Sequence, residues 1–260
     1  MQVYPVKTEI VKAGDALVDI ILEALKKQRL RLEDNDVLAL TSKIVSYSQG
    51  RLVKLSNVRP SRKAVELGKK YSLKPEFAEL ILREADRICG GVDKAVLTLK
   101  DSTLTANAGI DNKNSPADSA VLWPEDAPKW AEQFRRDVRF KTGKKVAVLI
   151  LDSGLIPLRI GTVGLALAVV GFKPIRECRG ESDLYGKPMT ITRHAVADDL
   201  ASAAHLLMGE AAEKVPAVLI KDAPVDFDEG VYGSTDMMMP PEECMFMNTL
   251  QRSWASGSKL

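Results

Sequence analysis

Apolar residues recur along this chain in two periods, which predict helices and strands in mixed order. The segment ALVDIILEALKKQRL (16–30) places apolar side chains three and four positions apart, which is typical of a helix with one buried face. The same spacing returns twice in the second half of the chain. Further helices are predicted at 60–89 (two helices, interrupted near Ser72 and Pro75), at 128–141 and at 196–210.

Short apolar runs between these helices predict strands. The run VAVLILD (146–152) is continuously apolar, as expected for a strand buried on both faces, and it ends in a carboxylate. The runs 94–100 and 102–110 meet at Asp101-Ser102 and predict a hairpin. Segment 36–46 (DVLALTSKIVS) predicts a strand running into a polar loop. Two more strands are expected at 2–6 and 215–222.

These elements do not alternate with the regular rhythm of a doubly wound Rossmann sheet. The predicted fold class is therefore α+β, with mixed α/β elements. The candidate region for a break between two domains is 60–90, although the composition does not shift strongly there. The long glycine-punctuated segment 154–186 and the Met- and Pro-rich tail 223–260 carry no assignment from the pattern.

Composition and charge narrow the class of protein. Thirty-seven basic residues against 35 acidic ones leave a net charge of +2, so no basic field favours nucleic acid as a partner. Hydrophobic residues (45%) and charged residues (28%) are balanced as in ordinary globular proteins, which excludes disordered and collagen-like chains. Residues 1–15 lack the apolar core of a secretory signal, and no apolar stretch is long enough to span a bilayer. Three widely spaced cysteines predict neither a zinc site nor disulfides, so a cytoplasmic protein without membrane partners is expected.

Standard nucleotide-binding and hydrolase motifs are absent from the sequence. Of the two histidines, His205 lies inside a predicted helix, where a structural role is the simpler interpretation. The stronger candidates are acidic residues where elements end: Asp111, Asp152 with Ser153 beside it, and Glu210. Carboxylate and hydroxyl oxygens are the ligands of Mg²⁺ and Mn²⁺. Solvated surface carboxylates would show the same spacing, so the pattern alone leaves both interpretations open.

Several motifs, in their order and spacing, resemble the coenzyme F420-0:L-glutamate ligase family, also called F420 γ-glutamyl ligases. The resemblance covers residues 1–222 and leaves 223–260 unmatched. It implies a two-domain α+β fold and homodimers with active sites near the subunit interface. The motifs are NAGID (107–111), Asp152-Ser153, R-x-G-x-x-G (159–164), DLYG (183–186), VADDLASAAHLLMGE (196–210) and Gln49-Gly50-Arg51.

The resemblance also implies an activity: GTP-dependent formation of an amide between L-glutamate and the carboxylate of F420-0, through an acyl phosphate and with two divalent ions. Asp111, Asp152 and Glu210 would be the catalytic residues. With Ser153 they would hold the Mg²⁺ or Mn²⁺ ions. The implied contacts with GTP are Glu9, Ile10, Val11, Ser42, Lys43, Tyr47, Asn114, Met208, Gly209 and Ala211.

Two departures from the family pattern bear on the substrate. Tyr47 stands where the family usually has a lysine, so a phosphate-neutralising charge is lost. The arginine that usually follows the Asp-Ser motif is also missing, and Ile156 stands in its place. Two alternatives therefore accompany the F420 prediction: a γ-glutamyl ligase acting on folate or another pterin, and a non-catalytic nucleotide-binding relative.

Overall fold

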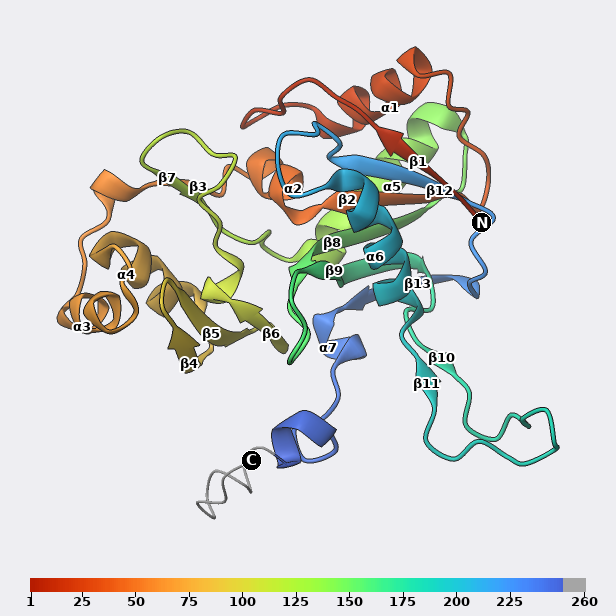
Figure 1. Ribbon diagram of the computed structural model, residues 1–260. Helices are drawn as coiled ribbons and strands as arrows, with labels where there is room; N and C mark the ends of the chain where they lie inside the picture. The colour runs from red at the N-terminus through yellow and green to blue at the C-terminus, as the bar shows by residue number, and fades with distance from the viewer. Residues whose placement is uncertain (250–260) are drawn as a thin grey trace.

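Six strands form one mixed sheet in the main body of the molecule (Figure 1). The structure is a computed structural model, and it describes residues 1–249. Strands β2 and β8 are parallel, and every other neighbouring pair in this sheet is antiparallel. The order is β1 (Gln2–Val6), β12 (Ala217–Lys221), β2 (Val37–Thr41), β8 (Ala147–Gly154), β9 (Val163–Phe172) and β13 (Phe227–Gly233).

Helices cover both faces of this sheet, which explains why its central strands are continuously apolar. Along β2, Leu38 and Leu40 belong to one hydrophobic cluster, whereas Val37 and Ala39 belong to the other. Successive side chains of a strand point to opposite faces, so a strand covered on both sides needs apolar residues at every position. The first face is covered by α1 (Leu17–Lys27), α2 (Ser42–Ser48) and α5 (Ala127–Thr142), and the second by α6 (Val196–Met208).

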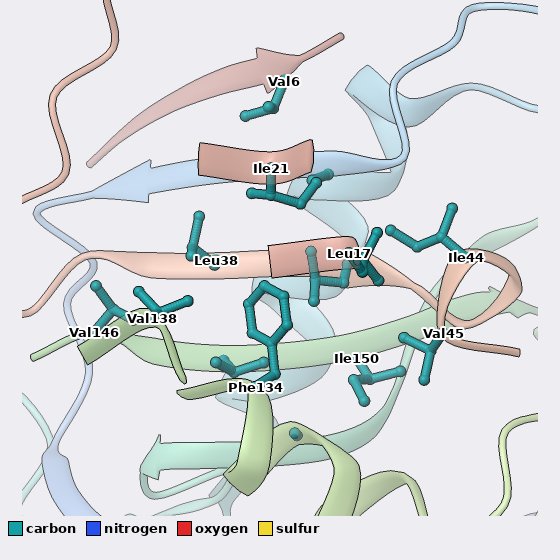
Figure 2. Packing of buried hydrophobic residues seen from close by; sticks show 14 of the residues in the cluster. Val6, Leu17, Ile21, Leu38, Ile44, Val45, Phe134, Val138, Val146 and Ile150 are labelled. Atoms are coloured by element: carbon teal, nitrogen blue, oxygen red, sulfur yellow. The ribbon is translucent and has the colours of Figure 1, made fainter. Parts of the chain in front are cut away.

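Aliphatic side chains from these helices fill the first face of the sheet. Figure 2 shows Ile21 of α1 and Phe134 of α5 in one cluster with Leu38 and Ile150 of the strands. Ile21 and Ile150 are fully buried, and burying such a side chain contributes about 1.5–3 kcal/mol relative to leaving it exposed. The predicted helices 16–30, 128–141 and 196–210 are confirmed, as is the strand 146–152, which continues to Gly154.

Residues 52–121 form a lobe inserted between α2 and α5, with a hydrophobic cluster of its own. As predicted, its two helices are separated at Ser72, which has a positive φ. The predicted hairpin also turns at Asp101-Ser102, and both of these residues have positive φ. The region 60–90 lies within this lobe. Its elements are β3 (Leu52–Lys54), η1 (Leu55–Asn57), α3 (Arg62–Tyr71), α4 (Pro75–Glu84), β4 (Arg87–Val92), β5 (Ala95–Lys100), β6 (Thr103–Ala106), η2 (Asn107–Gly109) and β7 (Ser119–Val121).

Three local predictions were wrong. Residues 87–89 were expected to end a helix but belong to strand β4, and residues 107–109 were expected to extend a strand but form the 3-10 helix η2. The polar segment after Thr41 was expected to be a loop, but it is the helix α2. Seven residues are too few to reveal helical periodicity, and an isolated helix of this length is unstable in water. Tertiary packing supplies the stability, because Ile44 and Val45 are buried against the sheet.

The segments without an assignment also contain regular structure. Residues 163–172 form β9, and residues 227–233 of the tail form β13, which pairs with β9 at the edge of the sheet. A short hairpin of β10 (Arg176–Glu177) and β11 (Arg193–His194) begins an arm that extends away from the main body (Figure 1), and α7 (Ser234–Met237) follows β13. The α+β class is confirmed, and the sheet is not of the Rossmann type. Within residues 1–249, no helix has the length and apolar character needed to cross a bilayer.

Candidate active site

A cavity of about 650 Å³ opens at the end of the sheet where β2 and β8 finish. Parallel neighbours end at the same edge, so the residues that follow them lie close together. The segment after α6 and the loop after Asp111 complete the wall. Every residue predicted for catalysis, metal binding or nucleotide binding lines this cavity: Glu9, Ile10, Val11, Ser42, Lys43, Tyr47, Asp111, Asn114, Asp152, Ser153, Met208, Gly209, Glu210 and Ala211.

Asp111 is held by its backbone and by both carboxylate oxygens. Its peptide N–H and C=O pair with Val121, at 3.0 and 2.8 Å, which fixes the residue at the edge of the inserted lobe. The Oδ2 atom accepts a hydrogen bond from Lys43 Nζ at 2.6 Å, and Oδ1 accepts one from the Lys113 N–H at 2.7 Å. The ion pair with Lys43 joins α2 of the main body to the lobe across the cavity.

Asp152 lies near the end of β8 and is partly buried in the wall of the cavity. Burial raises its pKa to about 6, and the negative charge of Asp111 acts in the same direction. The Trp123 indole and the Ser153 N–H both donate to the carboxylate and limit the rise in pKa. A carboxylate that is buried beside another carboxylate is electrostatically suited to receive a cation.

Glu210 follows the C-terminus of α6, where a negative charge opposes the helix dipole. Burial would raise its pKa, but hydrogen bonds from Thr162 and His205 outweigh burial, so the pKa is lowered. Both donors reach Oε1, Thr162 Oγ1 at 2.5 Å and His205 Nε2 at 2.8 Å. These two side chains are the compensating partners that the position requires.

The donor set fits a hard divalent cation. Asp111, Asp152 and Glu210 supply carboxylate oxygens and Ser153 a hydroxyl, the ligand types that Mg²⁺ and Mn²⁺ prefer. In residues 1–249, however, no three Asp, Glu, His or Cys side chains are grouped closely enough to hold an ion as they stand. Lys43 already donates a hydrogen bond to Asp111, and His205 already donates one to Glu210.

Three of the predicted nucleotide-contact residues, Tyr47, Asn114 and Ala211, are joined by hydrogen bonds in the wall of the cavity. Asn114 Nδ2 donates to the C=O of Ala211 at 2.7 Å, so the loop after Asp111 is tied to the segment after α6. Tyr47 Oη, one turn along α2 from Lys43, lies 3.4 Å from the C=O of Asn114. The tyrosine hydroxyl therefore lies at the junction of these two loops.

Sequence reasoning missed three residues that shape this site. His205 was given a structural role, yet it lines the cavity and binds Glu210. Thr162 was treated as part of a glycine-rich turn, and Trp123 was not considered. The spacing of His205 and Glu210 offered a signal, since residues five apart around a helix end can meet. No local signal connects Trp123 with Asp152.

The fold and this cavity define an α+β protein with an oxygen-rich cavity at one end of its sheet. A family model described as F420-0:gamma-glutamyl ligase matches residues 5–222. The chain belongs to this family, and it is an enzyme of the ligase class.

Three of the relatives named coenzyme F420:L-glutamate ligase illustrate the similarity. The protein from Methanothermobacter thermautotrophicus is 37% identical over 238 residues, which cover 91% of this chain and 94% of the relative. The Methanopyrus kandleri protein is 37% identical over 85% of this chain and 86% of its own length. The Archaeoglobus fulgidus protein is 34% identical, with 85% and 87% covered.

Proposed function

We propose that this chain is a GTP- and divalent-metal-dependent ligase that joins L-glutamate to the carboxylate of coenzyme F420-0. One observation carries the proposal: a single cavity of about 650 Å³ is lined by the carboxylates of Asp111, Asp152 and Glu210, the Ser153 hydroxyl, the Lys43 ammonium and the loop at Asn114. Its volume lies in the range of about 300–1,000 Å³ that is usual for small-molecule sites. The relatives named coenzyme F420:L-glutamate ligase support the same acceptor and the same amino acid.

The proposed metal ligands are Asp111 and Asp152 for one ion, and Ser153 and Glu210 for the other. Two Mg²⁺ or Mn²⁺ ions would supply positive charge to the phosphoryl group during its transfer. Two features of the chain itself favour the binding of cations at these carboxylates. Asp152 is kept in a buried position where its charge is unfavourable without a cation, and Lys43 neutralises Asp111 until a ligand enters.

The proposed reaction has two steps. A carboxylate oxygen of the acceptor attacks the γ-phosphorus of GTP, which forms an acyl phosphate and releases GDP. The α-amine of glutamate then attacks the acyl carbon, the amide forms, and phosphate and a proton leave. We expect Lys43, whose side chain is 25% exposed, to bind phosphate oxygens once its contact with Asp111 is exchanged.

Tyr47 bears on the acceptor and the nucleotide. A phenol cannot neutralise phosphate charge as a lysine does, so we expect Lys43 to carry more of that role in this chain. A folate or another pterin remains the alternative acceptor, and a non-catalytic nucleotide-binding protein the alternative class. We also propose a homodimer, supported by the arm at β10–β11, where Leu184 and Tyr185 are almost fully exposed.

The decisive experiment is a mass-spectrometric assay with glutamate, Mg²⁺ or Mn²⁺, and either GTP or ATP. F420-0 and folate are offered in parallel as acceptors. We expect a product one glutamyl residue heavier than F420-0, formed with GTP and lost when metal is chelated. A product with folate alone would identify the pterin alternative, and GTP binding without any product would refute the ligase proposal. Size-exclusion chromatography with light scattering tests the dimer.

A further inference from the structure

Trp123 lies directly behind the proposed metal site without lining its cavity. It follows β7, and only 3% of its surface is exposed. Its indole Nε1–H donates to Oδ2 of Asp152, while Oδ1 of the same carboxylate accepts the Ser153 N–H at 2.8 Å. Each carboxylate oxygen therefore has one fixed donor, and the plane of the carboxylate is set by the Trp123 indole, which does not line the cavity, and by the Ser153 backbone N–H.

Gly109 makes room for the indole ring. A Cβ atom at this position would lie 2.1 Å from Trp123 Cε2 and Nε1, closer than any real contact, and the glycine has φ of +70°. This is the glycine of the NAGID segment that ends at Asp111. The backbone that carries one proposed metal ligand is thus packed against the side chain that orients the other.

Hydrogen bonds also hold the backbone on both sides of Pro124, next to Trp123. Arg51 Nε donates to the Trp123 C=O at 2.8 Å, and the same guanidinium pairs with Glu84 at 2.8 Å. Gln49 bonds both backbone groups of Glu125, its Nε2 donating to the C=O at 2.7 Å and its Oε1 accepting the N–H at 2.9 Å. Segment 49–51 therefore holds the chain on both sides of Pro124.

We infer that Trp123 is a positioning residue of the active site: through its indole N–H it holds the Asp152 carboxylate in the orientation that receives a divalent ion. The inference rests on the proposed function of the site. Partners of metal ligands fix the direction of the ligand's lone pairs, and their loss typically weakens metal binding about 10- to 100-fold. Arg51, Gln49 and Gly109 act on the same carboxylate by fixing Trp123.

The first test reads the hydrogen bond itself in the metal-free protein by ¹H–¹⁵N NMR. The chain has three tryptophans, Trp123, Trp130 and Trp254, so three indole signals are expected. Loss of a signal in Trp130→Phe and in Trp254→Phe identifies the Trp123 signal by elimination. Asp152→Asn should shift the Trp123 indole proton upfield, because the charged acceptor is lost. Mg²⁺ should also move this signal, and the Trp130 signal should stay in place.

The second test compares Trp123→Phe with Trp130→Phe, whose ring stacks on Phe134 in α5 away from the cavity. Phenylalanine keeps most of the packing and removes the N–H. We expect the dissociation constant for Mn²⁺, measured by electron paramagnetic resonance of free Mn²⁺, to rise about tenfold in Trp123→Phe. In Trp123→Phe, kcat should fall, and the KM values for GTP and glutamate should stay unchanged. Trp130→Phe should match the wild type in all of these.

The possible outcomes separate the two proposals. If the Trp123 indole signal does not shift in Asp152→Asn, the proposed role of Trp123 is refuted. The role is also refuted if a folded Trp123→Phe variant binds Mn²⁺ with the affinity of the wild type. The NMR comparison keeps Trp123 in place, so it decides the question even if Trp123→Phe does not fold. A wild-type protein that binds Mn²⁺ but forms no product with any acceptor refutes the proposed function and leaves the positioning role standing. A wild-type protein that binds no Mn²⁺ overturns both.

Discussion

Replacing Asp152 with Asn should change how the stability of the metal-free protein depends on pH. Burial raises the pKa of this carboxyl from its ordinary 3.8 to about 6. The fold therefore favours the protonated form, and this contribution to stability is complete below about pH 4 and is lost as the pH rises through 6. The difference between the two pKa values corresponds to at most about 3 kcal/mol, at 1.36 kcal/mol per pH unit. Asparagine does not titrate, so the variant escapes this loss.

The assay is urea unfolding in chelated buffers between pH 4 and 8, with the free energy of unfolding compared at each pH. Asparagine can accept only one of the two hydrogen bonds that reach Asp152, which costs about 1 kcal/mol at every pH. The informative quantity is therefore the change with pH. From pH 4 to pH 7, the difference between variant and wild type should move in favour of the variant by up to about 3 kcal/mol.

A matched control is Asp93→Asn, which removes an exposed carboxylate from the turn between β4 and β5. The pH dependence of its difference from the wild type is the reference for Asp152→Asn, because it reports the loss of one exposed carboxylate. The same pH dependence in Asp152→Asn would refute the reasoning, since it would mean that burial does not penalise the charge. Saturating Mg²⁺ should stabilise the wild type more than the variant, because the ion needs the ionised carboxylate.

Three further predictions concern single side chains. Lys43→Met should raise the KM for GTP at least about tenfold, the loss expected for a hydrogen bond to a charged group, whereas Lys54→Met, on an exposed position of β3, should leave it unchanged; equal KM values would exclude Lys43 from phosphate binding. Gly109→Ala and Gly143→Ala both place a side chain at φ near +70°, but only Gly109 faces another side chain. Urea unfolding should show a loss of about 1–2 kcal/mol from backbone strain in both and a further loss of about 1–3 kcal/mol from overpacking in Gly109→Ala alone; similar losses would contradict the packing against Trp123. Glu210→Gln should lower kcat at least about 100-fold if it removes a metal ligand, while Glu229→Gln, on the edge strand β13, should not; normal turnover in Glu210→Gln would remove this residue from the metal assignment.

The most strongly patterned elements could be predicted from the sequence because each shows its burial locally. The run 146–151 is apolar at every position, and the helix 196–208 repeats its apolar face over several turns. The short or irregular elements could not. The helix α2 has seven residues, and β13 contains acidic residues and glycines that only its pairing with β9 orders.

The candidate site shows the same division. The sequence alone determined which residues are available: carboxylates after the strand-like segments, a serine beside Asp152, and motifs whose order matches a ligase family. Only the tertiary structure decided which of them meet. Lys43 reaches Asp111 across 68 positions, and Trp123 reaches Asp152 across 29. Such contacts depend on the register of the sheet and on the placement of the inserted lobe, and no local spacing encodes either, because each is fixed by the packing of segments far apart in the chain.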